Sequence, residues 1–360
     1  LPELLWQNGY TTFGTGKWHN RPETFARSFS TGGKVFFGGM SGDQYAFTVH
    51  NFDPSRAYDE HSLEIVNTFS TTLFADEAIP FLNTHDAEDN PFFAYVAFTS
   101  PHDPRTAPEP YGTMYDPDEI ELPPNYMDAH PFDLGISSIR DEVLAAQPRE
   151  ESEIRQHIAD YYGMISHMDA EIGRILQALE DNGLRDNTIV VYTSDHGLSV
   201  GQHGLMGKQN VYDHSMRIPM IIRGPGIAGG RQSDALCYLF DLFPTLCEQA
   251  GIPLPETNEG QSLNALLSGL TDVHRQTIFA AYQNQFGRPE DKPYQRMVRG
   301  TRYKLIESVH NGILTTQLFD MIDDPYETNN LVNEYRYSNV VQRLKKRLVG
   351  WQQIVDDPIL

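Results

Sequence analysis

Residues 188–214 of this chain, TIVVYTSDHGLSVGQHGLMGKQNVYDH, indicate its fold class. The run from Thr188 to Thr193 consists of β-branched and aromatic residues, which is typical of a strand buried on both faces of a parallel sheet. The run ends at the four residues 194–197, SDHG. Ligands of open α/β sheets bind at the carboxyl ends of the strands, so the stretch predicts a parallel sheet with a candidate site at its edge.

Asp195 and His196 are the first candidate site residues. A carboxylate beside an imidazole, followed by a glycine that lets the backbone turn, has the residue types of a metal site. The alternative interpretation is a strand-to-loop turn in which Asp195 caps a helix and His196 lies on the surface. Gly204 and Gly207 loosen the following loop and Lys208 adds a fixed cation, so we favour the metal-binding interpretation.

A second candidate stretch is residues 9–19, GYTTFGTGKWH. If its end is extended, Lys17 and His19 point to one face and Trp18 points to the other. A lysine and a histidine on one face, bordered by glycines, suit an oxyanion such as sulfate or phosphate. Taken alone, His19 is also compatible with a structural role.

A third candidate stretch is residues 92–104, FFAYVAFTSPHDP, in which an apolar strand is followed by His102. Pro101 and Pro104 stiffen the loop around this histidine. His102 alone is compatible with a structural role as well. Because all three stretches place a cation or a metal ligand just after a strand, we favour functional roles for these residues.

The remaining sequence predicts an α/β fold with a mainly parallel central sheet flanked by helices. A small antiparallel sheet plus a helix is expected after residue 270, which divides the chain into predicted domains 1–270 and 271–360. Residues 21–62 have no clear period and are expected to form a loop, and residues 104–149 a long surface excursion. The expected helices are 71–84, 150–182, 241–250 and 340–355, and the later strands are 218–223, 277–282, 295–299, 302–307 and 317–321.

Composition excludes several classes of partner. The net charge of −22 repels nucleic acid and acidic membranes at long range. A sulfated polysaccharide is repelled as well, so such a substrate depends on the local Lys, Arg and His cluster. The sequence contains no apolar stretch long enough to span a bilayer. Two cysteines, Cys237 and Cys247, argue against a disulfide framework and are expected in the core.

Taken together, the motifs resemble a known family. The patterns G-Y-x-T-x-x-x-G-K-W-H, P-H, S-D-H-G and G-x-H-G-x-x-x-K occur in the order found in type I sulfatases of the alkaline-phosphatase-like superfamily. Residues 217–226, 241–246 and 318–331 fit the same family. The resemblance covers essentially the whole chain, and the joint pattern is specific even though each motif is weak.

The resemblance implies roles for the candidate residues. Asp195 and His196 correspond to half of a divalent-metal site, usually calcium in this family, although an imidazole ligand is less typical of Ca²⁺ than oxygen. Lys17 and Lys208 correspond to the lysines that hold the sulfate oxygens. His203 also falls on a recurring family position, and we expect it to support the loop.

Two histidines receive catalytic roles from the same resemblance. His19 corresponds to the histidine beside the nucleophile, and His102 to one that contacts the sulfate or protonates the leaving oxygen. The family nucleophile is formylglycine, made from a Cys or Ser in a C/S-x-P/A-x-R sequence by a formylglycine-generating or anaerobic sulfatase-maturating enzyme. This chain lacks that sequence and the Asp-Asp pair of the first strand. Residues 52–56, FDPSR, contain P-S-R but follow the G-K-W-H motif, and we expect a turn there.

We therefore expect the chain to be a fragment of a bacterial, periplasmic or secreted sulfatase, with negligible turnover as an isolated segment. An in-frame upstream extension encoding the missing motifs is expected. The substrate is expected to be a sulfated small molecule or saccharide; residues 100–104, SPHDP, are similar to choline-sulfatase sequences. The alternatives are a phosphodiesterase or phosphonate hydrolase of the same superfamily, and a non-catalytic protein that binds sulfated glycans.

Overall fold

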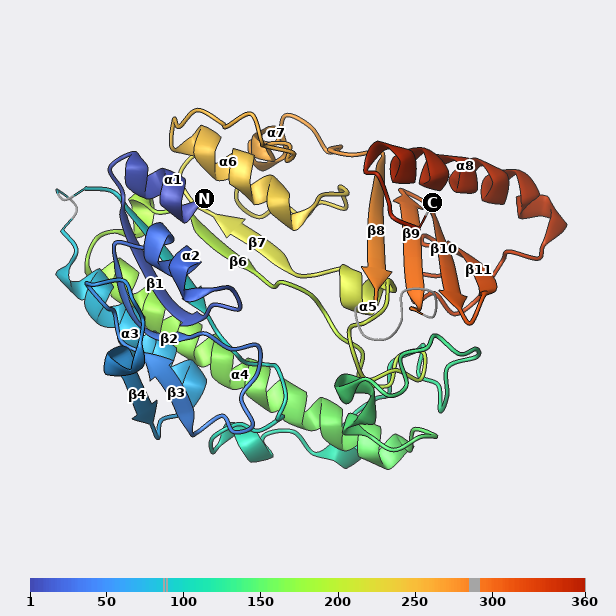
Figure 1. Ribbon diagram of the computed structural model, residues 1–360, viewed down its shortest axis with the longest axis horizontal. Helices are drawn as coiled ribbons and strands as arrows, with labels where there is room; N and C mark the ends of the chain where they lie inside the picture. Colours follow the sequence, from blue (N-terminus) through green and yellow to red (C-terminus); the bar gives the residue numbers. More distant parts are fainter. Residues whose placement is uncertain (87, 89, 285–291, 360) are drawn as a thin grey trace. The chain divides into compact units, whose positions relative to one another are not determined.

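The computed structural model describes residues 1–86, 88, 90–284 and 292–359 (Figure 1). The chain forms two compact units, each assembled from separate stretches. The first unit comprises Leu1–Ile120, Gln156–Val190 and Phe243–Glu259, and the second comprises Glu121–Arg155, Val191–Leu242 and Gly260–Leu360. The division into domains 1–270 and 271–360 stays a prediction.

The first unit is built on a sheet with the strand order β4-β3-β2-β1-β5. Strand β1 is parallel to both of its neighbours, β2 and β5, whereas β3 is antiparallel to β2 and β4. The predicted α/β class is confirmed, with the antiparallel strands confined to one side of the sheet. The strands are β1 (Thr11–Lys17), β2 (Thr31–Phe36), β3 (Phe47–His50), β4 (Leu63–Val66) and β5 (Phe92–Ala97).

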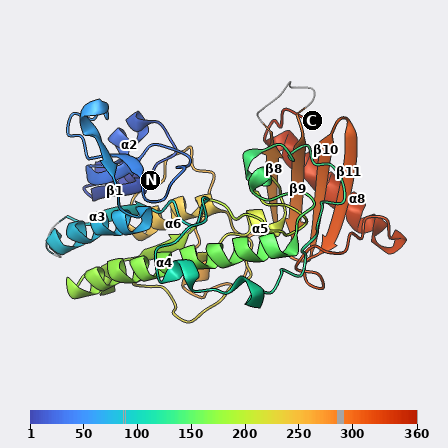
Figure 2. The same ribbon diagram turned by 90° about the horizontal axis from the view of Figure 1, so that it is seen from below.

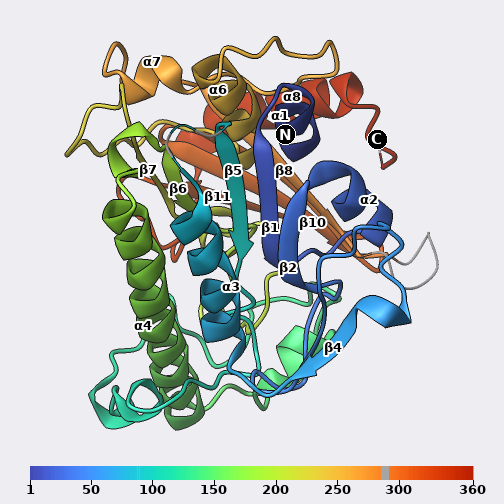
Figure 3. The same cartoon turned by 90° about the vertical axis from the view of Figure 1, so that its left-hand side faces the viewer.

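Helices cover both faces of β1. Successive residues of a strand point to opposite faces of the sheet, so neighbouring residues of β1 contact different helices. The Phe13 ring stacks on Phe81 of α3 at a centroid distance of 4.5 Å, whereas a side chain at Gly14 would meet the Phe25 ring of α2. Helices α3 and α4 lie side by side in two views (Figures 2 and 3). The helices with residues in this unit are α1 (Pro2–Gln7), α2 (Pro22–Ser28), α3 (Ser70–Thr84), α4 (Glu151–Asp181) and α6 (Leu242–Gln249).

The expectation of a loop over residues 21–62 is wrong, because this stretch contains α2, β2 and β3. The sequence TGGKVF of β2 was misleading, since glycine is normally unfavourable inside a strand. Here close packing requires it. A Cβ at Gly32 would overlap the Gly14 carbonyl oxygen of β1, and a Cβ at Gly33 would overlap the Glu77 carboxylate of α3.

The second unit contains an antiparallel sheet with the strand order β11-β10-β9-β8 and the strand pair β6-β7. The predicted strands and terminal helix after residue 270 are confirmed. The strands are β6 (Val190–Thr193, whose first residue belongs to the first unit), β7 (Met220–Arg223), β8 (Thr277–Gln283), β9 (Tyr294–Gly300), β10 (Tyr303–His310) and β11 (Ile313–Asp320). The helices are α5 (Asp213–Met216), α7 (Asn264–Leu267) and α8 (Ser338–Ile354).

The two faces of the antiparallel sheet pack against different partners. Val298 of β9 belongs to a core cluster with Leu344 of α8, which lies along the sheet (Figure 1). The next residue back, Met297, belongs to a second cluster with Leu205 and Tyr212. Residues 205–212 are therefore supported directly by the sheet.

Short 3-10 helices complete the fold: η1 (Glu60–Ser62), η2 (Tyr111–Thr113), η3 (Pro117–Glu119), η4 (Arg140–Leu144), η5 (Arg185–Asn187), η6 (Leu239–Asp241) and η8 (Tyr335–Tyr337). Residues 104–149 contain η2, η3 and η4 but are only partly the predicted surface excursion. Asp141, Glu142 and Arg149 are buried. Glu142 and Arg149 form an ion pair with each other, which compensates these two buried charges.

Cys237 and Cys247 carry free thiols, as expected for a chain without a disulfide framework, and Cys247 is buried. In the stretches that the structure describes, we find no helix with both the length and the apolarity that crossing a membrane requires.

Candidate functional site

In the first unit, the candidate residues lie where β1 and β5 end. These strands are parallel and Gly16 is paired with Ala97, so their carboxyl ends lie at the same edge of the sheet. Lys17 is the last residue of β1. His102 follows the end of β5 in the loop at that edge. The structure thus places Lys17 and His102 at the edge where open α/β sheets bind ligands.

Trp18 is partly buried, whereas His19 is exposed. The indole contacts Phe25 and Phe29 in edge-on geometry. The His19 ring lies against Gly39 in the loop after β2, because a Cβ built there would come 2.6 Å from its Cε1 atom. Since β2 is also parallel to β1, His19 belongs to the same edge as Lys17.

Asp103 holds the imidazole of His102. The Nδ1 atom of His102 lies 3.0 Å from the Asp103 main-chain oxygen and 3.2 Å from its carboxylate Oδ1. Both acceptors select the tautomer in which Nδ1 carries the proton and Nε2 is the ring nitrogen directed away from Asp103. Gln44 fixes the same loop by donating to the His102 carbonyl at 3.1 Å. Asp103 therefore orients His102.

Arg105 is held by helix α4. Its Nη1 donates to Nδ1 of His157 at 3.0 Å, and the side chain is partly buried. This contact gives Arg105 a loop-stabilising role.

In the second unit, Asp195 and His196 follow β6 directly. The His196 main-chain N–H donates to Asp195 Oδ1 at 3.1 Å, and His196 Nδ1 donates to the Gly197 carbonyl at 2.9 Å. The Ser194 hydroxyl donates to the His196 carbonyl at 2.8 Å. These bonds fix both side chains, with His196 Nε2 lying 3.6 Å from Asp195 Oδ2.

The donor set of Asp195 and His196 fits a divalent cation. Two ligands each ~2.4 Å from one ion, at a right angle, are separated by ~3.4 Å, close to the observed 3.6 Å between Oδ2 and Nε2. The Asp195 side chain is 71% exposed and is therefore accessible to an ion. Within the described residues, no group of three or more His, Cys, Asp or Glu is arranged to hold a metal, so these two would supply part of a coordination shell.

Residues 194–215 form what we name the Lys208 loop, and hydrogen bonds close it on itself. The Ser199 main-chain N–H and hydroxyl both donate to the Gly207 carbonyl, at 3.0 and 2.9 Å. The Gly197 N–H donates to the Ser215 carbonyl at 2.9 Å. The loop therefore links the Asp195-His196 pair to Lys208 within one hydrogen-bonded segment.

Acidic residues that the sequence did not single out hold the Lys208 loop. The Glu142 carboxylate accepts from the main-chain N–H groups of Met206 and Gly207, each at 3.0 Å. Burial raises the pKa of Glu142, although these donors and Arg149 favour its charged form. Arg149 Nη2 lies 2.7 Å from Glu142 Oε2, and both side chains are fully shielded from solvent.

Asp141 lies next to the side-chain amine of Lys208. Its Oδ2 atom is 3.9 Å from Lys208 Nζ and accepts a hydrogen bond from Gln209 Nε2 at 2.8 Å. The Gln209 Oε1 atom in turn accepts from the Lys208 main-chain N–H at 3.0 Å. No sequence signal marks Asp141 or Glu142, because the pairs form only when the 104–149 segment packs on the loop.

A second buried ion network lies at the end of the Lys208 loop. Lys304 is fully buried, with Nζ 2.9 Å from Asp213 Oδ1 and 2.7 Å from Glu327 Oε1. Burial alone would raise the pKa of Asp213, but Lys304 and Arg299 lower it to about 2. This network ties the loop to β9 and β10.

His203 has a packing role, as the sequence favoured. Its ring stacks on Tyr212 at a centroid distance of 4.1 Å, and its Nε2 donates to the Glu327 carbonyl at 3.0 Å. The side chain is buried. Burial lowers its pKa, so the neutral ring is favoured.

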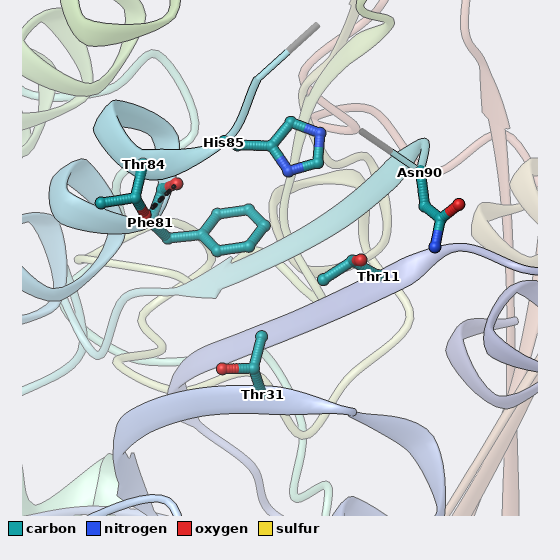
Figure 4. Close-up of a pocket in the computed structure, with 6 residues that line it drawn as sticks. All are labelled: Thr11, Thr31, Phe81, Thr84, His85 and Asn90. Carbon is teal, nitrogen blue, oxygen red and sulfur yellow. Dashed lines mark hydrogen bonds between the residues drawn. The ribbon is translucent and has the colours of Figure 1, made fainter. Parts of the chain in front are cut away.

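A separate cavity of about 350 Å³ lies in the first unit, at the amino ends of the strands (Figure 4). Thr11 begins β1 and Thr31 begins β2, while Thr84 ends α3. His85 also lines this cavity. Since parallel strands have their carboxyl ends at the opposite edge, this cavity is distinct from the edge that carries Lys17.

Comparison with known proteins identifies the family of the chain. A profile of the sulfatase family matches residues 1–252, and a profile for the C-terminal region of N-sulphoglucosamine sulphohydrolase matches residues 201–354. The chain belongs to the sulfatase family. The resemblance inferred from the sequence motifs is thereby confirmed, while the individual roles of the site residues stay predictions.

Several sulfatases are similar over nearly the whole chain. The ulvan-active sulfatase of Formosa agariphila is 26% identical, over 97% of this chain and 64% of that protein. The N-acetylglucosamine-6-O-sulfatase of Bacteroides thetaiotaomicron is 28% identical, over 99% of this chain and 73% of that protein. A structure solved in complex with its substrate, D-glucosamine-2-N,6-O-disulfate, has a TM-score of 0.81 and 25% identity, covering 99% of this chain and 82% of that one.

The chain spans only part of some curated relatives, with 64%, 61% and 58% of the length of three of them. The similar structures confirm the predicted architecture of a central sheet flanked by helices with an added antiparallel sheet.

Proposed function

We propose that this protein hydrolyses sulfate monoesters, with a sulfated sugar as its substrate. The observation that carries the proposal is the placement of basic residues after strands in a member of the sulfatase family. Lys17 is the last residue of β1 and His102 follows the parallel strand β5 in the first unit, and the Lys208 loop of the second unit follows β6. Fixed cations at strand ends are suited to stabilising a sulfate in its transition state.

In this proposal the two lysines bind sulfate oxygens, and the histidines transfer protons. His102 enters this step as the imidazolium and donates its Nε2 proton to the departing alcohol oxygen, while Asp103 accepts from Nδ1–H and so keeps the ring in position. His19 is assigned to the side of the nucleophile. Lys17 and Lys208 compensate the negative charge that develops on the sulfate group.

Asp195 and His196 would hold a divalent cation, with Ca²⁺ as the proposed ion. When bound, such an ion supplies Lewis-acid charge that stabilises the ester oxygens. Formylglycine as nucleophile, its maturating enzyme, and a periplasmic or secreted location are part of the same proposal. Their support is the family membership of the chain.

A sulfated sugar is proposed because of the relatives. One similar structure was solved with D-glucosamine-2-N,6-O-disulfate as its substrate, and two similar sulfatases are named for ulvan and for N-acetylglucosamine 6-O-sulfate groups. The net charge of −22 means that attraction must come from the local basic residues.

The proposal is tested first by binding, because binding does not require the nucleophile. Calorimetric titration of the 360-residue chain with N-acetylglucosamine 6-sulfate should give saturable binding that Lys208→Ala weakens about tenfold or more. Lys345→Ala, which removes a surface lysine paired with Glu307, is the matched control. Binding equal in the wild type and Lys208→Ala would contradict the assignment of Lys208.

Turnover is tested on the protein expressed from its complete gene together with a maturating enzyme. Sulfate release from sulfated sugars should exceed hydrolysis of the matching phosphate esters and phosphonate esters. Chelation should abolish activity, added Ca²⁺ should restore it, and His196→Ala should lower Ca²⁺ affinity in calorimetry of the unreacted protein. Preference for the phosphorus esters would replace the proposal by the phosphodiesterase or phosphonate hydrolase alternative. Sulfated-sugar binding without turnover would favour the non-catalytic one.

A further inference from the structure

A cavity of about 530 Å³ lies in the second unit beside the edge strand β8, and no role has been assigned to it. Its lining includes Tyr282 and Gln283 from β8, Asn284 directly after it, Arg296 from β9, and Gln209 from the Lys208 loop. A volume of this size is in the range of small-molecule sites.

The lining of this cavity favours a neutral ligand rich in hydroxyl groups. Gln209, Gln283 and Asn284 each carry an amide, which offers both a donor and an acceptor, as a sugar hydroxyl does. Tyr282 adds an aromatic ring that is partly buried against the core of the unit. Aromatic rings with a polar group suit ligands that have both apolar faces and polar edges.

The charge in the lining argues against a second sulfate. Among the described lining residues the cationic group is Arg296, and Asp357 already neutralises it. The Nε and Nη2 atoms of Arg296 lie 2.6 and 2.7 Å from the two carboxylate oxygens of Asp357. Both side chains are almost fully buried, so an anionic ligand would have to compete with a shielded two-point ion pair.

The cavity is connected to the Lys208 loop through Gln209. Gln209 lines the cavity, and its side chain bonds both the Lys208 main-chain N–H and the Asp141 carboxylate, which lies 3.9 Å from Lys208 Nζ. The lining of the cavity therefore includes the residue that follows, in sequence, the lysine proposed to bind sulfate.

We infer that this cavity binds an uncharged sugar residue joined to the sulfated one, so that the substrate is an oligosaccharide. That the ligand also carries a sulfated sugar residue rests on the proposed function. That the cavity binds a neutral sugar does not rest on it, because the lining residues are separate from Lys17, His102 and Lys208. Sugar recognition in the cavity would select oligosaccharides over sulfated monosaccharides and small aryl sulfates.

The test uses neutral oligosaccharides as probes, so that it is independent of sulfate binding and of turnover. Chitotriose, cellotriose and agarotetraose are titrated into the 360-residue chain by calorimetry. We expect at least one to bind, and Tyr282→Ala and Asn284→Ala to weaken that binding by about tenfold or more. Tyr335→Ala, which removes a tyrosine that is 93% exposed, is the matched control.

The thermal unfolding midpoint of each variant is measured alongside, and Gln283→Ala provides a further variant if one of the others fails to fold. No binding of any probe, or equal binding by the wild type and the folded cavity variants, would overturn the inference. Lys208→Ala separates the two proposals. Loss of N-acetylglucosamine 6-sulfate binding with Lys208→Ala but no neutral-sugar binding leaves the proposed function and removes this inference. Neutral-sugar binding that requires Tyr282, without sulfate binding, supports the cavity and removes the proposed function.

Discussion

The buried pair of Glu142 and Arg149 allows a direct test of how the Lys208 loop is held. We expect Arg149→Met to destabilise the folded chain by about 3–5 kcal/mol, because it leaves the Glu142 carboxylate buried without a counter-charge. Both side chains are fully shielded, and the ion-pair distance is 2.7 Å. Arg149 also donates to the Ala145 and Gly204 carbonyls at 2.6 and 3.0 Å. Each lost bond costs about 1 kcal/mol, so the upper part of the range is expected.

The loss of folding stability in Arg149→Met should depend on pH in a defined direction. Burial already raises the pKa of Glu142 above its ordinary 4.5 in the wild type, and removal of Arg149 should raise it further. The folded variant then binds a proton more tightly than the unfolded chain. Its deficit relative to the wild type should therefore shrink as the pH falls from the pKa of Glu142 in the variant to the lower pKa in the wild type, by about 1.4 kcal/mol per pH unit.

The assay is urea unfolding of wild type and variants followed by circular dichroism between pH 5 and pH 8. Arg336→Met is the control, because its ion pair with Glu334 is exposed (70% and 40%) and should contribute less than about 1 kcal/mol. Glu142→Gln combined with Arg149→Met should recover part of the loss, which gives the coupling energy of the pair. An Arg149→Met deficit no larger than that of the control, or one that does not diminish on acidification, would refute the reasoning.

Three further predictions concern stability. Acidification from pH 6.5 to 4 should destabilise the wild type in urea unfolding. Burial lowers the pKa of His130 from 6.5 to about 4, so in this interval the unfolded chain binds a proton that the folded chain does not. His130 alone contributes about 3 kcal/mol, and an unchanged slope in His130→Gln would count against this. Lys304→Met should cost about 3–5 kcal/mol by thermal unfolding, because it leaves the buried Glu327 carboxylate without a counter-charge and Asp213 with Arg299 alone; a loss as small as that of Lys345→Met would disprove it. Gly32→Ala should cost more than about 2 kcal/mol, because its Cβ overlaps a carbonyl of the neighbouring strand. Gly42→Ala has open space around it and should change stability by less than about 0.5 kcal/mol; equal effects of the two would contradict the packing argument.

The parts of the site that the sequence predicts are those that depend only on local pattern and strand direction. Lys17 ends one strand and His102 follows another, and parallel strands place their carboxyl ends at one edge, so their common location follows without knowledge of packing. Trp18 was likewise separated from Lys17 by the period of an extended strand. The strand β2 was missed because its glycines are explained only by their close packing, Gly32 against the Gly14 backbone and Gly33 against the Glu77 carboxylate.

The residues that the sequence did not predict are those whose partners lie far along the chain. Glu142 and Arg149 look like part of an acidic, proline-rich surface segment until the Lys208 loop packs against them. Lys304 carried a usable signal, because it shares a face of β10 with the core residue Ile306 under the two-residue period of a strand. A lysine at a core position requires a buried carboxylate. The sequence shows that a partner must exist but not that it is Asp213 and Glu327.

These unpredicted charges explain how the second unit holds its candidate site residues. The Lys208 loop begins at Asp195 and His196, and two ion networks hold it, Glu142 with Arg149 near Lys208 and Lys304 with its carboxylates at the far end. Buried ion pairs add little net stability compared with apolar packing of the same volume. Their contribution here is geometric, because the Glu142 and Glu327 carboxylates also accept main-chain N–H groups of the loop. A loop fixed in this way keeps Lys208 in place before a ligand arrives, so binding does not have to order the backbone.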